Sequence, residues 1–112
     1  MARKTVSATI AGEVDERLSE LAKLYGMNKS SLLNRLLYRT FSKPDAIKNL
    51  IAVRLSEREN VIKRSYRIDE ELLESMNQYP DLSIGTIIEK AAAQWMALND
   101  EERRDFLFFW EV

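Results

Sequence analysis

Residues 4–37, KTVSATIAGEVDERLSELAKLYGMNKSSLLNRLL, change their hydrophobic period once. In the first part apolar residues alternate with hydroxyl residues, which is typical of a half-buried β-strand: Val6, Ala8 and Ile10 against Thr5, Ser7 and Thr9. Further on, apolar residues recur every three or four positions, which predicts helices, and charged residues such as Asp15 fall on the other faces. Gly26 can end the first helix and Asn28 can cap the second. The stretch predicts a strand, a helix, a tight turn and a helix.

The same order of elements returns in residues 61–96, VIKRSYRIDEELLESMNQYPDLSIGTIIEKAAAQWM. An alternating segment comes first, with Ile62, Tyr66 and Ile68 as its apolar residues. A helix follows that Pro80 should break, and Ser83 can cap the next one. The two stretches align if the second loses about three residues around the turn between its helices. The chain therefore contains an internal repeat of element order and polarity, with little residue identity.

Two further segments complete the predicted organisation. Residues 42–60 form a linker, in which DAIKNLIAVRLSERE is expected to be helical, with Pro44 where a first-turn proline is tolerated. Residues 99–112 begin with Asn99 as an N-cap followed by three acids, which predicts a C-terminal helix. We therefore divide the chain into a first unit (1–41), a linker (42–60), a second unit (61–98) and a C-terminal helix (99–112).

The composition excludes several classes of protein. The chain has no cysteine and no histidine, so disulfides, thiolate chemistry and the commonest general base and metal ligand are missing. There is no glycine-rich phosphate loop, nucleophile motif or metal-ligand spacing, so we expect neither an enzyme nor a cofactor. The acids at 69, 70, 71 and 74 are best explained as a helix start. No apolar segment is long enough for a signal peptide or a membrane span, which predicts a cytoplasmic location.

The charge is unevenly distributed along the chain. The net charge is −1, yet residues 1–43 carry eight basic and four acidic side chains, a net +4, while residues 44–98 carry −2 and residues 99–112 carry −3. This polarity fits a protein with one surface that faces an anion, although acids at helix starts also contribute to it.

A strand with two short helices is too small to bury a sufficient core, and its open edge is a further liability. Pairing the two alternating segments solves both problems within one chain. The predicted fold is mostly α with a small two-stranded antiparallel β-ribbon, whose apolar side covers four helices. Arg64 is the exception to the pattern, because it falls on the side that should point inward, so that strand is expected to begin later or to twist away.

The pattern resembles the ribbon-helix-helix family, the MetJ/Arc superfamily of DNA-binding proteins, in a tandem single-chain form. The resemblance covers residues 4–41 and 61–97, and the segment YGMNKSSLL falls where the family has its glycine turn and polar helix start. It implies an intramolecular pseudo-dimer that binds double-stranded DNA in a prokaryotic cell or its virus or plasmid. The implied roles are those of a transcriptional repressor or of an accessory protein in plasmid or phage DNA processing.

Carried over by position, the resemblance implies two groups of DNA-contacting residues. The outward strand residues would read bases in the major groove: Thr5, Ser7, Thr9, Lys63, Ser65 and Arg67. The starts of the second helices would bind phosphates: Asn28, Lys29 and Ser30 in the first unit, and Ser83, Ile84 and Gly85 in the second. The second set has no charged side chain and is expected to bind more weakly. The outer side of one strand is neutral and that of the other is cationic, which predicts an asymmetric or imperfect target sequence rather than a palindrome.

Less specific interpretations stay open at this point. Serines and threonines alternate on many solvated strands, the basic residues of the second strand can protect an edge, and Asn28 can be an ordinary cap. The tail ends on a cluster of aromatic residues that either packs on the body or binds a protein partner or a second copy: Phe106, Phe108, Phe109 and Trp110. The alternative function is therefore a protein-interaction module, such as an antitoxin or inhibitor, that acts through this acidic, aromatic tail.

Overall fold

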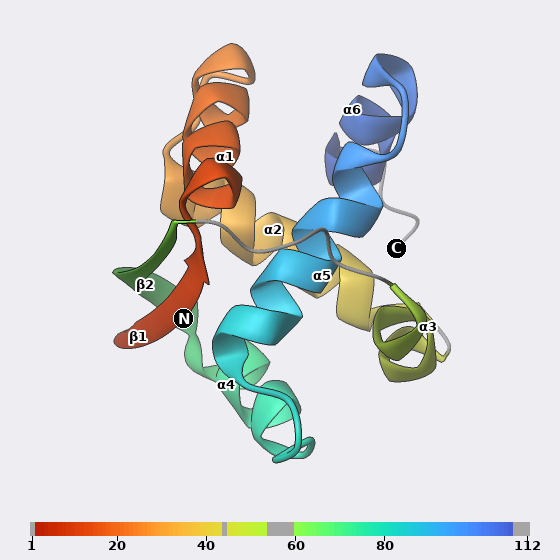
Figure 1. Cartoon of the computed structure of the whole chain (residues 1–112). Helices are drawn as coiled ribbons and strands as arrows, with labels where there is room; N and C mark the ends of the chain where they lie inside the picture. Colours follow the sequence, from red (N-terminus) through yellow and green to blue (C-terminus); the bar gives the residue numbers. More distant parts are fainter. Residues whose placement is uncertain (1, 44, 54–59, 109–112) are drawn as a thin grey trace.

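The computed structural model describes residues 2–43, 45–53 and 60–108, which form six helices and one two-stranded antiparallel sheet. This confirms the predicted class of a mostly helical protein with a small β-ribbon. Figure 1 shows the ribbon at one side of the molecule, with α3 and α6 on the far side. The elements in chain order are β1 (Arg3–Ala11), α1 (Gly12–Leu24), α2 (Lys29–Phe41), α3 (Ala46–Ala52), β2 (Val61–Asp69), α4 (Glu70–Asn77), α5 (Ile84–Met96) and α6 (Asp100–Phe108).

The two strands pair in a single register, with Ser7 opposite Ser65 at the centre. On the inner side Ala8, Tyr66 and Ile68 are buried, as the alternation predicts. A shift of one residue would turn the inner side chains outward, because successive side chains point to opposite faces, so burial fixes the register. Each strand also contacts a helix from the other part of the chain: α5 packs on β1, and α2 packs on β2.

Each end of the ribbon is closed by one backbone hydrogen bond, and the two bonds occupy equivalent positions in the two repeats. The N–H of Gly12, which opens α1, donates to the carbonyl of Asn60 just before β2, at 3.0 Å. The N–H of Glu70, which opens α4, donates to the carbonyl of Ala2 just before β1, at 3.1 Å. The strand-to-helix corners of the two repeats therefore have matching geometry.

Polar side chains from α2 and α5 bind the strand ends in the same reciprocal way. Asn34 Oδ1 of α2 accepts from the N–H of Asp69 at the end of β2 (2.8 Å), and Glu89 Oε1 of α5 accepts from the N–H of Ala11 at the end of β1 (2.5 Å). Both side chains are buried. An unpaired buried N–H is costly, so these two bonds tie each long helix to the opposite strand.

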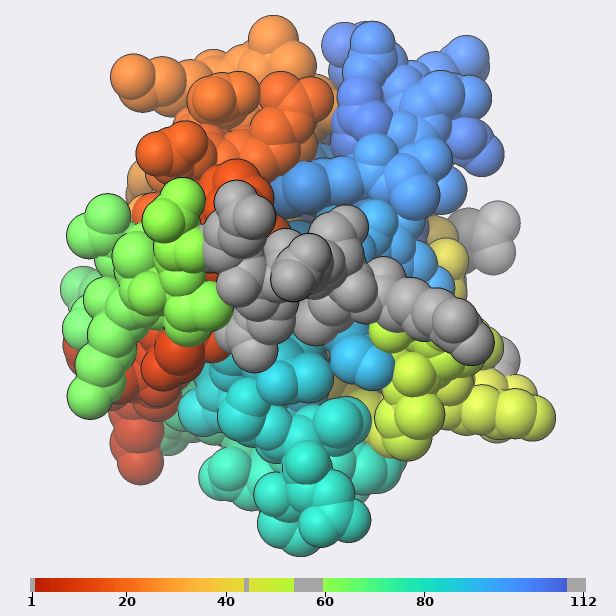
Figure 2. Space-filling model, viewed as in Figure 1, coloured from red at the N-terminus to blue at the C-terminus, as the bar shows by residue number. Residues whose placement is uncertain are grey.

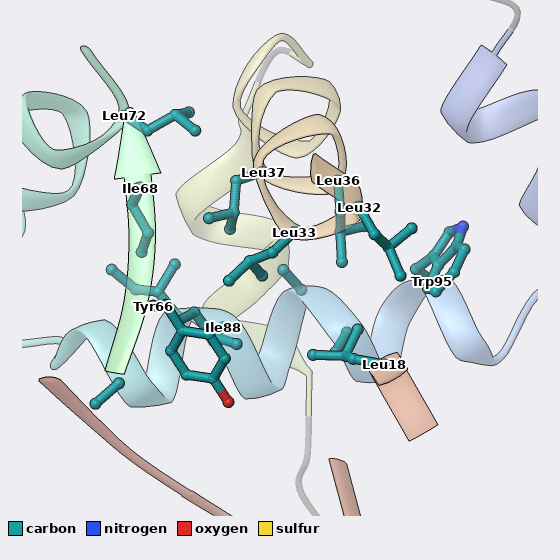
Figure 3. Packing of buried hydrophobic residues seen from close by; sticks show 14 of the residues in the cluster. Leu18, Leu32, Leu33, Leu36, Leu37, Tyr66, Ile68, Leu72, Ile88 and Trp95 are labelled. Atoms are coloured by element: carbon teal, nitrogen blue, oxygen red, sulfur yellow. The ribbon is translucent and has the colours of Figure 1, made fainter. Parts of the chain in front are cut away.

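The core lies between the inner side of the ribbon and the crossing helices α2 and α5 (Figure 3). Its largest fully buried side chains include an aromatic residue from α5 and a row of leucines from α1 and α2: Trp95, Leu18, Leu32, Leu33, Leu36 and Leu37. Tyr79 is half-buried just beyond the end of α4. Burial of large apolar side chains by both halves makes one shared core.

The helix ends follow the predicted caps. Gly26 has a φ of 69°, its N–H donates to the carbonyl of Lys23, and the N–H of Met27 donates to that of Ala22, so α1 ends in a Schellman motif. The predicted shortening of the second repeat by three residues is confirmed: residues 11–28 correspond to residues 69–83. The loss falls in the helix rather than in the turn. Helix α4 has eight residues against thirteen in α1, and the connection that follows α4 is longer than the one that follows α1.

The linker helix is shorter than predicted. It ends at Ala52, and Val53 is already extended (φ −68°, ψ 125°), so the expected continuation through residue 53 is wrong. Pro44 and residues 54–59 lie outside the described residues. Leu50 faces the core and Ile47 packs partly against it, whereas the neighbouring Ile51 is 58% exposed.

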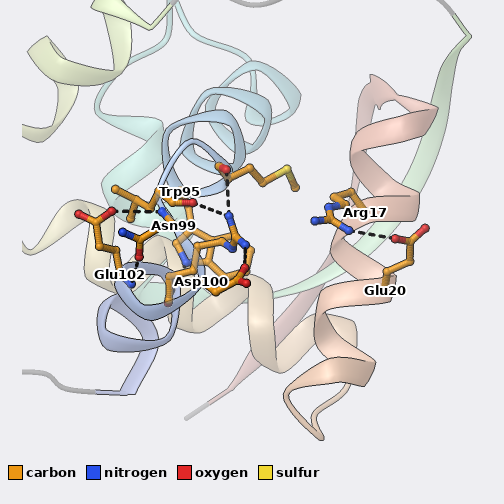
Figure 4. A network of polar contacts seen from close by, with 9 residues as sticks. Arg17, Glu20, Trp95, Asn99, Asp100 and Glu102 are labelled. Carbon is orange, nitrogen blue, oxygen red and sulfur yellow. Dashed lines mark hydrogen bonds and ion pairs between the residues drawn. The ribbon is translucent and has the colours of Figure 1, made fainter.

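The C-terminal helix begins as predicted, with a capping box. Asn99 Oδ1 accepts from the N–H of Glu102, and Glu102 Oε1 accepts from the N–H of Asn99 (Figure 4). The indole N–H of Trp95 donates to the carbonyl of Arg103 at 3.1 Å, and Leu107 is fully buried. The helix is therefore fastened to α5 and to the core.

Candidate nucleic-acid interface

The outer side of the ribbon exposes all six side chains that were predicted to read bases. The register places them in three cross-strand pairs: Thr5 with Arg67, Ser7 with Ser65, and Thr9 with Lys63. Figure 2 shows the two strands, β1 in red and β2 in green, side by side at one edge of the molecule. Opposed residues of an antiparallel pair lie about 5 Å apart, so the six side chains form one compact polar surface.

The charge of this outer surface is positive. Lys63 and Arg67 have no ion-pair partner among the described residues. Arg3, at the end of β1, is paired through its Nε with Asp69 Oδ1 at 2.8 Å, and Asp69 is buried. No other acidic side chain belongs to the strands that the structure describes. The outer surface therefore presents donors and cations together with hydroxyl groups.

The start of α2 lies beside the basic end of the ribbon. Asn28 caps the helix, its Oδ1 accepting from the N–H of Ser31 at 2.8 Å, as predicted. A cavity of about 410 Å³ opens there, lined by Arg3, Asn28, Lys29, Ser30 and Arg67. The structure thus brings the three predicted residues of the first helix start into contact with the same hollow as Arg67. The positive end of the α2 dipole lies at the same cavity, so it adds to the positive charge of these side chains.

Asp15 is a buried member of this region that the sequence pattern misplaced. It was expected on a polar face of α1, yet only 5% of it is exposed. Its Oδ1 accepts from the ammonium of Lys29 (2.8 Å) and from the hydroxyl of Tyr66 (2.7 Å), and its Oδ2 lies 3.4 Å from Nε of Arg64. Because its partners come from α2 and β2, the helical period of α1 gave no signal for this cluster.

The electrostatics of the cluster are dominated by this carboxylate. Burial alone raises the pKa of Asp15, but the hydrogen bonds from Lys29 and Tyr66 and the charges of Lys29 and Arg64 outweigh it and hold the pKa below its usual value. The pKa of Tyr66 is raised, first by burial and then by its hydrogen bond to the Asp15 carboxylate. Asp15 is therefore ionised at neutral pH and Tyr66 is a hydrogen-bond donor.

Arg64 behaves differently from the expectation. β2 begins at Val61, so the strand does not start after Arg64, which lies opposite Ala8 in the ladder. Its side chain remains 56% exposed and reaches the Asp15 carboxylate at the edge of the ribbon. The ion pair allows a long cationic side chain to occupy an inward position without burying its charge.

The matching site of the second half has a different chemistry. Ser83 Oγ accepts from the N–H of Thr86 at 3.1 Å, so the predicted cap is present, and Ile84 is half-buried. Gly85 is buried against β1: a Cβ there would lie 2.2 Å from the carbonyl oxygen of Thr9. The nearby hollow, of about 310 Å³, has Val6, Leu73 and Ile84 among its lining residues, together with Lys4, Glu70 and Glu74. It lacks the cluster of cations found at the first helix start.

The described part of the tail packs on the body of the protein. The Phe106 ring lies 4.8 Å from the ammonium of Lys43 and 5.7 Å from the guanidinium carbon of Arg39. Phe108 is 40% exposed and meets the ring of Tyr25 edge-on, with centroids 6.0 Å apart. Phe109 and Trp110, also predicted as interface residues, lie outside the described part of the chain.

Comparisons of the chain with models of protein families, with curated proteins and with solved structures found no match. Within residues 2–43, 45–53 and 60–108, no helix is long and apolar enough to cross a membrane. The same residues contain no group of three or more acidic side chains placed to hold a metal ion.

Proposed function

We propose that the chain is a sequence-specific DNA-binding protein built as an intramolecular ribbon-helix-helix pair. The observation that carries the proposal is the outer side of the ribbon, with six exposed polar residues in three cross-strand pairs and two cations without partners among the described residues. The reciprocal corner bonds of the two repeats and the packing of α2 and α5 on opposite strands support the paired arrangement.

The dimensions of the ribbon suit the major groove. Two hydrogen-bonded strands lie about 4.8 Å apart, and the major groove of B-DNA is about 12 Å wide and admits a two-stranded ribbon. The helices lie behind the inner side of the ribbon and leave its outer side open (Figure 1). A ribbon placed at one edge of the molecule can enter a groove without a clash from the helices.

The six side chains have complementary abilities for reading bases. Arg67 and Lys63 can donate to the O6 and N7 acceptors of guanine, and they extend from the same side of β2, with Ser65 between them. The hydroxyls of Thr5, Ser7 and Thr9 can donate or accept, and the threonine methyls can contact a thymine methyl. The neutral strand and the cationic strand would therefore read different base patterns.

Phosphate contacts are proposed to be strongest at one end. The α2 start offers free backbone N–H groups beside Lys29, Arg3 and Arg67, whereas Ser83, Ile84 and Gly85 at the α5 start offer amides but no side-chain charge. The complex would then have one strong and one weak phosphate grip. Its target would be asymmetric or an imperfect repeat, and its biological output would be repression by occupancy or assistance in processing plasmid or phage DNA.

The test is selection from random-sequence duplex DNA, followed by anisotropy measurements on the recovered pool at two salt concentrations. We expect an enriched, asymmetric motif and an affinity that falls as salt rises, because bound cations displace counterions from the phosphates. Salt-sensitive binding without a motif would contradict sequence-specific reading and indicate an architectural role. The absence of binding even at low salt would refute DNA binding altogether.

The second candidate function is protein recognition through the C-terminal tail, for which the exposed ring of Phe108 is the supporting observation. Removing residues 99–112 would be a poor test, since Leu107 is part of the core and its loss would damage folding. The single change Phe108→Ala leaves that residue in place. If this variant binds DNA normally but loses a protein partner, the tail is the functional surface.

A further inference from the structure

The Asp15 cluster contains Lys29, one of the basic residues of the proposed phosphate site, and Arg64, at the edge of the ribbon. Lys29 and Arg64 both face one carboxylate whose side chain is 7% exposed, while their own side chains are 31% and 56% exposed. Lys29 also lies 5.5 Å from the centroid of the Tyr66 ring. Two cations, one from α2 and one from β2, are thus held by a single buried anion.

The carboxylate is not a general requirement of this fold. When the repeats are aligned on Val14 and Leu72, Asp15 corresponds to Leu73, which packs near Val6 and Ile84 in the second half. The same place beneath the ribbon is filled there by apolar side chains. A charge network in one half and an apolar cluster in the other point to a role for Asp15 beyond packing.

Resting on the proposed function, we propose that Asp15 is a specificity-determining positioning residue: by binding Lys29 and Arg64, it limits their sequence-independent attraction to DNA phosphates. The discrimination between sequences is then left to the outer side of the ribbon, where Lys63 and Arg67 have no such partner in the part of the chain that the structure describes. The binding site would combine freely available base-reading cations with restrained phosphate-facing cations.

The physical basis is competition between two anions for the same cations. A free cation that neutralises a phosphate steepens the salt dependence by about 0.9 per contact, and this part of the affinity is the same for every sequence. A cation already paired with a carboxylate must give up or share that contact, so its net gain on DNA is smaller. Replacing the carboxylate by an amide keeps the shape and leaves an oxygen that can accept from Lys29 and Tyr66, but it removes the competing charge and the acceptor that faces Arg64.

The experiment compares Asp15→Asn with Glu16→Gln, a matched control that removes the same charge from an exposed neighbour on α1. The dissociation constants for the selected duplex and for a random duplex are measured over a series of salt concentrations. For Asp15→Asn we expect random-duplex binding to tighten by about three- to tenfold and the slope to steepen by about one to two. The selected duplex should gain less, so the specificity ratio falls, and Glu16→Gln should leave the ratio unchanged.

Several results would overturn the inference. An equal effect of Glu16→Gln would mean that only net charge matters, and weaker binding to both duplexes at an unchanged slope would mean that Asp15 merely supports the fold. If Asp15→Asn does not fold, the variant Lys29→Gln in the otherwise unchanged chain tests the inference instead. We expect its salt slope to differ from that of the unchanged chain by less than about half a unit. Loss of a full unit would refute the proposal that Asp15 restrains Lys29. Failure of the unchanged chain to bind any DNA refutes the proposed function itself, which keeps the two failures distinct.

Discussion

Asn34 in α2 accepts the backbone N–H of Asp69 through its Oδ1 at 2.8 Å, although the two residues lie in different halves of the chain. The Nδ2 of the same side chain donates to the carbonyls of Arg67 (2.8 Å) and Ser30 (2.7 Å). All of its polar atoms are therefore used, and they join the start of α2 to the end of β2. This amide therefore helps to fix the position of the proposed phosphate site relative to the ribbon.

Replacing Asn34 by alanine should destabilise the fold. The change leaves the buried N–H of Asp69 without a partner and removes a bond to Arg67, which should cost about 2 to 3 kcal/mol of unfolding free energy. Urea denaturation followed by circular dichroism measures the loss. Asn49→Ala, an exposed amide on α3, is the control and should change stability by less than about 0.5 kcal/mol. A similarly small effect at Asn34 would show that its bonds are dispensable.

Gly85→Ala should be far more damaging than its helical position suggests. Alanine is favoured over glycine in a helix by about 1 kcal/mol, but the new Cβ would lie 2.2 Å from the carbonyl oxygen of Thr9, so α5 or β1 must shift. We expect loss of cooperative unfolding or a fall in the free energy of unfolding of more than about 3 kcal/mol. Gly26→Ala is the comparison, with a φ of +69° but open space around it, and should cost only about 1 kcal/mol. Equal effects of the two changes would contradict the close packing of α5 on β1.

The stability of the protein should depend on acid through Asp15. Because the pKa of its carboxyl is lower in the folded state than the ordinary 3.8, the unfolded chain takes up a proton first. The stabilisation is therefore fully present above pH 3.8 and is lost as the pH falls below it. Asp15→Asn should be less stable than the unchanged chain at pH 7, and the difference should shrink below pH 3.8. Denaturation at a series of pH values tests this, and a difference that stays constant throughout would contradict it.

Arg67→Ala should reduce sequence discrimination without harming the fold. Its side chain is exposed and has no ion-pair partner among the described residues, so thermal stability should change by less than about 0.5 kcal/mol. Loss of a guanine contact should cost about 1 to 3 kcal/mol at one position of the target and relax the preference there. Binding to a panel of single-base variants measures the effect. A uniform loss on all of them would assign Arg67 to phosphate instead.

Local features of the sequence predicted the local structure well. The caps at Asn28, Ser83 and Asn99 are confirmed, because a capping side chain binds backbone groups only three residues away. The alternation of the two strands is also confirmed, because the residue type at each position reflects whether that side of the strand is buried. The helix expected through residue 53 was wrong, because α3 buries only Leu50 completely and propensity alone does not hold a short helix.

Features that depend on distant partners could not be read from the pattern. Asp15 looks like any charged residue on α1, and its burial follows from Tyr66 and Lys29, which approach only in the folded chain. The same applies to Glu89, a carboxylate on the apolar side of α5 whose partner is the N–H of Ala11. The cavity beside Arg3 and Arg67 likewise requires the start of β1 and the end of β2 to meet the start of α2.

The pairing of β1 with β2 inside one polypeptide has a consequence for how such a surface can evolve. A substitution in one strand alters only one side of the ladder, because Thr5 and Arg67, or Thr9 and Lys63, are encoded by separate codons. In a ribbon made from two identical chains every substitution would occur twice, once on each side of the symmetry axis. Here the two strands can diverge independently, and because the ribbon forms within one molecule, its assembly does not depend on protein concentration.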